Sequence, residues 1–144
     1  MILGLSHVTI LVADLARTAA LLTGALGARE VYRSGETAFS LSHERFFLLG
    51  NLWLCAMEGE PPPRSYAHIA LEVPEDALDG LRARLEAAGA EVLPGRARIT
   101  AEGRSVYFYD FDNHLFELHA GSLEARLAGY AGAEEERRTR YGAP

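Results

Sequence analysis

Two stretches decide the fold of this chain: LSHVTILVADLARTAALLTGALGAREV at residues 5–31 and YAHIALEVPEDALDGLRARLEAAGAEV at residues 66–92. Each has a histidine at the start of a β-rich run, then an amphipathic Ala/Leu-rich segment that ends at a Gly-Ala pair. This order of signals predicts strand, helix, turn and strand. From the histidine to the glycine is 20 positions after His7 and 21 after His68. The near-equality indicates an internal duplication.

Further strand-like runs follow each repeat and complete two βαβββ modules. They are TAFSLS, RFFLL and LWLCAM in the first half, then SVYFYD and LFELHA in the second. The Pro- and charge-rich segment EGEPPPRS, residues 58–65, is the expected linker. We therefore predict an α+β fold in which two modules, about residues 1–59 and 66–121, form curved mixed sheets around a metal site.

One domain is expected to span residues 1–128, because 144 residues with 49% hydrophobic content suit a single sizeable core. Past about Arg126 the sequence GYAGAEEERRTRYGAP carries mixed charge without an apolar stripe. We expect residues 129–144 to be a charged tail that is frayed or disordered, with no part in the chemistry.

The charge balance favours a small-molecule ligand. A formal net charge of −6 argues against nucleic acid or an anionic membrane as the partner. The 14 basic residues counted as Lys and Arg are all Arg, which excludes lysine-based covalent chemistry. The N-terminus lacks the features of a signal peptide, no apolar run is long enough to span a membrane, and Cys55 has no partner for a disulfide. These features predict a cytoplasmic protein.

Alternation along the strands groups the polar side chains that could do chemistry, because residues two apart share a face. The groups are His7 with Thr9, Tyr66 with His68, Ser105 with Tyr107, and Glu117 with His119. Glu117 is a carboxylate inside an otherwise apolar strand and therefore needs a partner.

Two histidines at equivalent points of two repeats, together with Glu117, form a plausible set of three metal ligands. Imidazole and carboxylate suit Mn²⁺, Fe²⁺, Zn²⁺, Ni²⁺ or Co²⁺, and three protein ligands leave positions open for substrate. When the last strands are aligned by their terminal glycines, Cys55 falls opposite Glu117. Cys55 is interpreted as buried packing, and His119 as a hydrogen-bonding partner behind the ligands. His114 is assigned to a turn.

Three blocks of the sequence resemble the fosfomycin-resistance proteins of the vicinal oxygen chelate superfamily. They are GLSHVTILVADL, LWLCAMEGEPPPRSYAHIALEV and EGRSVYFYDFDNHLFELHAGSLEARL. The resemblance implies that His7, His68 and Glu117 bind Mn²⁺ and that the protein is a homodimer. It also implies a phosphonate site, for which the candidates are Thr9, Tyr66, Arg98, Ser105, Tyr107 and Arg126.

The segment FSLSHERFFLLGNLW resembles the branch of these proteins that hydrates the epoxide of fosfomycin. In that branch a glutamate at the position of Glu44 is the general base, and thiol-transferring relatives lack a carboxylate there. Three alternatives stay open: metal-dependent thiol transfer to the same drug, a non-catalytic drug-binding protein of the bleomycin-resistance kind, and another metalloenzyme of the superfamily such as a glyoxalase or an isomerase.

Overall fold

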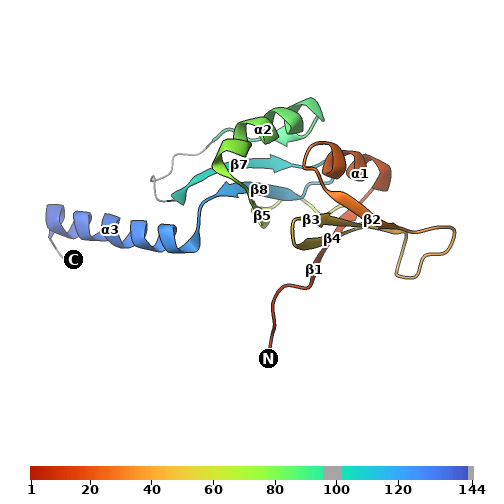
Figure 1. Ribbon diagram of the computed structural model, residues 1–144, viewed down its shortest axis with the longest axis horizontal. Coiled ribbons are helices and arrows are strands. Elements are labelled where there is room, and N and C mark those ends of the chain that lie inside the picture. The colour runs from red at the N-terminus through yellow and green to blue at the C-terminus, as the bar shows by residue number, and fades with distance from the viewer. Residues whose placement is uncertain (96–101, 143–144) are drawn as a thin grey trace.

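The computed structural model describes residues 1–95 and 102–142 and contains two modules of the same kind (Figure 1). The first module comprises β1 (His7–Val12), α1 (Leu15–Gly24), β2 (Arg29–Arg33), β3 (Glu44–Leu49) and β4 (Leu52–Glu58). The second comprises β5 (His68–Glu72), a 3-10 turn (Glu75–Ala77), α2 (Leu78–Ala87), β6 (Glu91–Val92), β7 (Arg104–Tyr109) and β8 (Leu115–Ala120). The predicted βαβββ order is confirmed in both halves. His7 and His68 are each the first residue of their module's first strand.

Each module forms one four-stranded mixed sheet, and the two sheets have the same strand order. The order is β1-β4-β3-β2 in the first sheet and β5-β8-β7-β6 in the second. In both, the module's first and last strands pair in parallel and the other neighbours are antiparallel. The strand that begins with the histidine therefore lies directly beside the last strand of its module.

The ends of the helices explain why the repeats fold alike. Asp14 caps α1 by accepting hydrogen bonds from two N–H groups of its first turn. Gly27 and Gly89 follow the two helices with φ of +69° and +83°, a region that residues with a Cβ rarely adopt. The N–H after each glycine donates back into the helix, to Leu22 at 2.9 Å and to Leu85 at 3.0 Å. The predicted Gly-Ala stops are thus confirmed.

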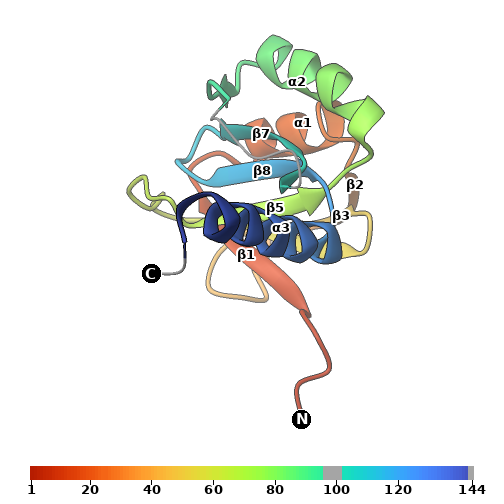
Figure 2. The same ribbon diagram turned by 90° about the vertical axis from the view of Figure 1, so that its left-hand side faces the viewer.

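One face of each sheet packs against its helix, and the two packed faces share a core (Figure 2). Phe47 and Leu54 of the first sheet have no exposed surface. In the second sheet, Phe108 and Phe116 stack with ring centroids 5.3 Å apart. Full burial of each such side chain stabilises the fold by about 1.5–3 kcal/mol. The side chains that alternate with these core residues along the strands lie on the opposite face of each sheet.

The turn between β7 and β8 ties the second module to the first. The Asp112 carboxylate accepts a hydrogen bond from the backbone N–H that follows β1, at 3.0 Å. The Arg17 guanidinium lies 3.6 Å from the centre of the Phe111 ring. In the same turn His114 pairs with a buried carboxylate at 2.7 Å, which confirms its assignment to a turn.

One predicted strand is absent from the described structure. Residues 37–42, TAFSLS, are a series of bends, and β3 begins only at Glu44. Phe39 and Leu41 are 84% and 96% exposed, so the alternating apolar side chains of this segment are not buried in the core. The Ser42 hydroxyl instead donates to a backbone carbonyl at the end of β4. A polar contact of this kind competes with strand pairing.

Residues 127–141 are helical, so the expectation of a frayed or disordered segment there is wrong. Helix α3 (Leu123–Tyr141) projects from the body of the protein (Figure 1). Ser122 caps it by accepting from an N–H of the first turn at 3.1 Å, and Ala, Glu and Arg favour the helical conformation. None of its residues is buried, as the missing apolar stripe suggested. No helix in the described residues is long and apolar enough to cross a membrane.

Candidate metal centre and substrate site

The predicted site residues of the strands lie on the sheet faces that the helices leave uncovered, while Arg126 is on α3. In the first sheet, Thr9 pairs with Cys55, and His7 pairs with Trp53. In the second sheet, Glu117 pairs with Tyr107. Paired residues share a face, so each module carries its polar set on one side of its sheet.

In the second module, His68 and Glu117 form the centre of the site. His68 Nε2 lies 3.2 Å from Glu117 Oε2, and the carboxylate is 4% exposed. The other ring nitrogen, Nδ1, lies 2.9 Å from the carbonyl oxygen of Tyr66. A carbonyl can only accept, so Nδ1 carries a proton, and in the neutral imidazole the lone pair of Nε2 faces the carboxylate.

This geometry fits a cation. In the neutral imidazole, Nε2 and Oε2 are both acceptors, and two acceptors 3.2 Å apart need a proton or a metal cation between them. Two ligand atoms bound at right angles to one transition-metal ion, with bonds of about 2.1 Å, lie about 3 Å apart. His68 and Glu117 therefore stand as two neighbouring ligands would.

A chain of hydrogen bonds holds the other oxygen of Glu117. The Ser105 hydroxyl donates to Glu117 Oε1 at 2.6 Å and lies 2.8 Å from His119 Nδ1. His119 Nε2 lies 3.3 Å from the Arg126 guanidinium, which can only donate. His119 thus accepts from Arg126 and donates from Nδ1 towards Ser105, and its predicted role as a hydrogen-bonding partner is confirmed.

Aromatic rings surround His68. Tyr66 and Tyr107 place their rings 5.1 Å and 5.6 Å from the imidazole, and the two phenols lie 6.5 Å apart. Tyr66 is 68% exposed, so the cluster opens to solvent on the site face. Both rings therefore lie on the same side of the site as the predicted ligand His68.

The first module carries a different arrangement. His7 packs against Trp53 with ring centroids 4.5 Å apart, at the exposed start of β1. Glu44 is only 7% exposed, and its Oε2 accepts a hydrogen bond from the Cys55 thiol at 3.4 Å. Burial, followed by the contact with Glu44, raises the pKa of the Cys55 thiol from 9.0 to about 11. The thiol therefore remains a neutral donor at physiological pH.

One chain brings only part of the predicted site together. Within residues 1–95 and 102–142, no three His, Cys, Asp or Glu side chains gather in a group that could hold a metal ion. His68 and Glu117 meet in the second sheet, whereas His7 contacts Ser6 and Trp53 in the first. The candidate Arg98 lies outside the described residues.

Sequence reasoning missed two residues of the first module. Cys55 is buried, as its interpretation as packing predicts, but the sequence gives no sign that it contacts Glu44. Nor does it indicate that Trp53 packs against His7. The signal for Cys55 lay in the alignment of the modules. Cys55 pairs with the residue two after His7, and Glu117 pairs with the residue two after His68. Their predicted equivalence is confirmed.

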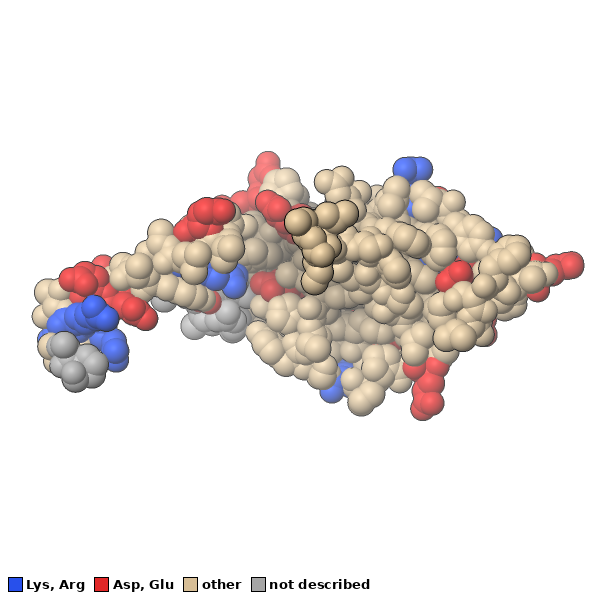
Figure 3. Space-filling view, turned by 90° about the horizontal axis from the view of Figure 1, so that it is seen from below, with Lys and Arg blue, Asp and Glu red and all other residues tan. Residues whose placement is uncertain are grey.

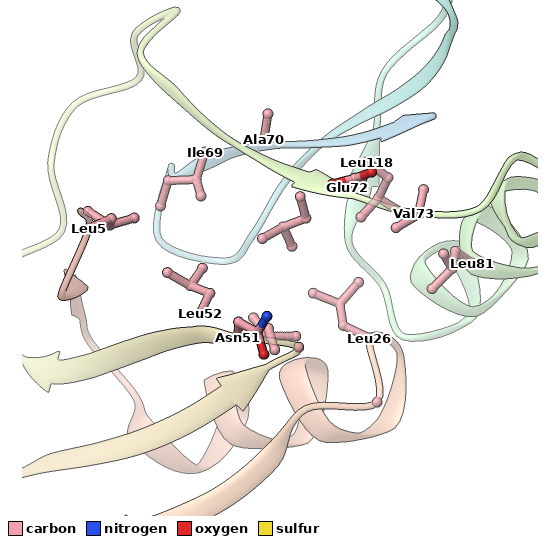
Figure 4. Close-up of a pocket in the computed structure, with 14 residues that line it drawn as sticks. Leu5, Leu26, Asn51, Leu52, Ile69, Ala70, Glu72, Val73, Leu81 and Leu118 are labelled. Carbon is pink, nitrogen blue, oxygen red and sulfur yellow. The ribbon is translucent and has the colours of Figure 1, made fainter. Parts of the chain in front are cut away.

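A separate cavity of about 480 Å³ lies between the two modules (Figure 4). Most of the residues that line it are apolar, with side chains such as Leu26, Leu52 and Ile69 directed into it, and Asn51 and Glu72 add polar groups. None of the predicted site residues lines it, so the candidate chemistry lies elsewhere.

Residues 4–118 match the model of the Glyoxalase/Bleomycin resistance protein/Dioxygenase superfamily. The chain belongs to this superfamily. The match spans both modules, and the two four-stranded mixed sheets with their helices are the glyoxalase-type, or vicinal oxygen chelate, fold that the family resemblance implies and the repeats agree with.

Several members of the superfamily resemble the whole chain. It is 52% identical over 131 residues to the fosfomycin resistance protein FosX of Listeria innocua, covering 90% of this chain and 98% of that one. A FosX mutant from Listeria monocytogenes, crystallised with Mn(II) and 1S,2S-dihydroxypropylphosphonic acid, is 50% identical with a TM-score of 0.82, covering 90% and 99%. The metallothiol transferase FosB of Staphylococcus epidermidis is 34% identical over 139 residues, covering 93% and 95%.

Proposed function

We propose that this protein catalyses the Mn²⁺-dependent hydration of the epoxide of fosfomycin. The observation that carries the proposal is the buried carboxylate of Glu44, on the same sheet face as His7 and Thr9. Water is a poor nucleophile at neutral pH, and a carboxylate at the site is the base that hydration needs. The higher identity to FosX than to the metallothiol transferase supports the same choice.

His7, His68 and Glu117 would hold the Mn²⁺ ion. Two imidazoles and one carboxylate suit a divalent transition metal, and the facing acceptor atoms of His68 and Glu117 support this set. When bound, the ion polarises the epoxide oxygen and stabilises the negative charge that develops there. The L. monocytogenes FosX complex, which contains Mn(II), supports manganese as the metal.

A homodimer would complete the site, with His7 from one copy and His68 and Glu117 from the other. In support, the three side chains do not gather within the described part of one chain. The face turned away from α1 and α2 carries few charged side chains (Figure 3). Trp53 Nε1, beside His7, is buried without a hydrogen-bond partner among the described residues, at a typical cost of about 1–3 kcal/mol. A second copy or the substrate would supply that partner.

The reaction adds water across one C–O bond of the epoxide. The water oxygen forms a bond to carbon, the bond from that carbon to the epoxide oxygen breaks, and Glu44 takes one proton of the water. The epoxide oxygen takes a proton from solvent and becomes the second hydroxyl, and Glu44 then releases its proton to solvent. The product is a vicinal diol phosphonate, which is the class of molecule bound in the L. monocytogenes FosX crystal.

Side chains around the metal ligands would bind the phosphonate. Arg126 brings a fixed positive charge to the end of the hydrogen-bond chain behind Glu117, where its guanidinium lies 3.3 Å from His119 Nε2. Hydroxyl groups on the two site faces would add hydrogen bonds to the phosphonate oxygens, and Arg98 stays a candidate. The hydroxyl residues are Thr9, Tyr66, Ser105 and Tyr107.

We also infer that the protein acts in the cytoplasm. The single, buried thiol of Cys55 is compatible with a reducing compartment, where thiols stay free.

The test is a product assay with and without thiol. Mn²⁺-loaded protein is incubated with fosfomycin in ¹⁸O-labelled water, and products are followed by phosphorus NMR and mass spectrometry. We expect a diol that carries one solvent oxygen, formed at the same rate whether or not glutathione is present. A thiol adduct as the sole product would assign the protein to thiol transfer. Intact fosfomycin would identify a drug-binding protein or an enzyme with another substrate.

A further inference from the structure

Glu44 and Cys55 are diagonal neighbours on adjacent strands of the first sheet. Ser105 and Glu117 are the corresponding diagonal neighbours in the second sheet. The residue two after Glu44 pairs with Cys55 across β3 and β4. The residue two after Ser105 pairs with Glu117 across β7 and β8. Side chains on such a diagonal share a face and approach closely enough to hydrogen-bond when one of them is long.

Donor and acceptor are exchanged between the two diagonals. In the second sheet the donor, Ser105, is on the module's third strand and the carboxylate of Glu117 is on its fourth, with 2.6 Å between the bonded oxygens. In the first sheet the carboxylate of Glu44 is on the third strand and the donor, Cys55, is on the fourth, at 3.4 Å. Each module thus fixes one carboxylate oxygen with one short side-chain donor.

We propose that Cys55 is a positioning residue for hydration, and that its thiol holds Glu44 Oε2 so that Oε1 accepts the proton of the attacking water. The inference rests on the proposed function of Glu44 as the base. Both side chains are buried, at 3% and 7% exposure, so the hydrogen bond acts where little water competes for the carboxylate. Without it, Glu44 can rotate away from the productive orientation, and small misplacements lower kcat.

A thiol suits this task better than a stronger donor. A cation beside Glu44 would stabilise the carboxylate and weaken it as a base, whereas a thiol is a weak, neutral donor. The raised pKa of Cys55, about 11, keeps the proton on sulfur. Thr9, which pairs with Cys55 across β1 and β4, lowers the pKa of the thiol, but burial and Glu44 raise it by more.

The kinetic test compares Cys55→Ala with Cys55→Ser, which differ by a single hydroxyl. We expect the alanine variant to lose about tenfold in kcat, the typical effect of one hydrogen bond to a charged group. Its KM for fosfomycin and its Mn²⁺ content should stay as in the wild type, because Cys55 touches neither in the proposal. The serine variant keeps a donor and should recover part of the loss. An alanine variant with wild-type kcat would overturn the inference.

A double-mutant cycle separates positioning from general damage to the fold. In a Glu44→Gln background, Cys55→Ala should cost no further activity, because the base that it positions is already gone. The same tenfold loss in both backgrounds would show that Cys55 acts on packing and would reject the positioning role.

A spectroscopic readout tests the contact independently of activity. The chain has one cysteine, so the S–H stretching band in the infrared spectrum reports on Cys55 alone. We expect the band to lie at lower frequency in the wild type than in Glu44→Gln, since a carboxylate accepts more strongly than an amide. Identical bands would refute the Glu44–Cys55 hydrogen bond. If the wild type forms no diol, the proposed function fails, and the band still decides whether this pair exists.

Discussion

The two modules share one strand order but place their buried carboxylates on different strands, and this difference separates the proposed metal ligand from the proposed base. Glu117 is on β8, directly beside β5 and its histidine. Glu44 is on β3, which is separated from β1 by β4. Adjacent strands lie about 4.8 Å apart, so Glu117 lies next to His68, whereas Glu44 is about two strand spacings from the strand of His7. A carboxylate one strand away can share an ion with the histidine; a carboxylate two strands away is available to bind a water proton.

The comparison predicts that the same substitution has different consequences in the two modules. Glu117→Gln replaces a charged ligand with a neutral amide beside His68. We expect Mn²⁺ affinity to fall by more than about a hundredfold and hydration to fall to background. Isothermal titration with Mn²⁺ measures the first effect, and phosphorus NMR the second. Wild-type Mn²⁺ affinity in this variant would remove Glu117 from the metal site.

Glu44→Gln should spare the metal and remove the base. The amide is nearly isosteric, so the fold, the Mn²⁺ content and fosfomycin binding should persist. Hydration should fall by about a hundred- to ten-thousandfold, the usual contribution of a general base. Diol formation is measured at saturating Mn²⁺ and drug. If the rate stays near that of the wild type, a metal-activated water needs no base from this position, and the contrast between the modules loses its functional meaning.

Much of the fold could be predicted from the sequence because the duplication repeats each local signal. The two histidines, the two Gly-Ala stops and the turn at residues 110–113 all hold in the structure. Residues 37–42 have a strand-like pattern, but a strand also needs a neighbour and a buried face, which local pattern does not supply. Helix α3 was missed for the opposite reason. Its Ser122 cap and helix-forming composition act without burial, whereas the prediction relied on an apolar stripe.

The candidate site could be predicted where alternation along a strand was enough. Thr9, Ser105 and Glu117 lie on the faces that the two-residue period assigns to them. The contact between Glu44 and Cys55 depends on the register between two strands, which a single sequence does not fix. The sequence suggests the set of His7, His68 and Glu117 through the repeats, but how His7 would meet the second module depends on the proposed assembly, which a single sequence does not fix.

The donors that support the two carboxylates should also differ in what they control. Ser105→Ala removes the hydrogen bond to Glu117 and should lower Mn²⁺ affinity by about ten- to a hundredfold, the usual effect of losing a partner behind a ligand. Cys55→Ala is the matched control, and its Mn²⁺ affinity should equal that of the wild type. Competition with a fluorescent chelator measures both. Equal losses of Mn²⁺ affinity in the two variants would mean that Ser105 and Cys55 do not divide metal binding and base positioning between them.

The smallest expected effect is on stability at high pH. The folded protein binds the Cys55 proton more tightly than the unfolded chain, because the pKa rises from 9.0 to about 11 on folding. Above pH 9 the unfolded chain loses this proton while the folded protein keeps it, so the stability contributed by the protonated thiol is complete below pH 9 and is lost as the pH rises through about 11. The loss is on the order of 2 kcal/mol.

Cys55→Ser gives the matched control for this pH effect, because a serine hydroxyl does not titrate in that range while all tyrosines remain. The free energy of unfolding is measured by urea denaturation of both proteins at intervals from pH 7 to pH 11, and the difference between them is plotted against pH. We expect a constant difference up to about pH 9 and a steady decline of the wild type relative to the variant above it. Because Ser105 in the second module carries no titrating proton, the decline is specific to the thiol of the first. A difference that stays constant to pH 11 would mean that neither burial nor Glu44 raises the pKa of this thiol, and the contrast between the two diagonals would then be one of geometry alone.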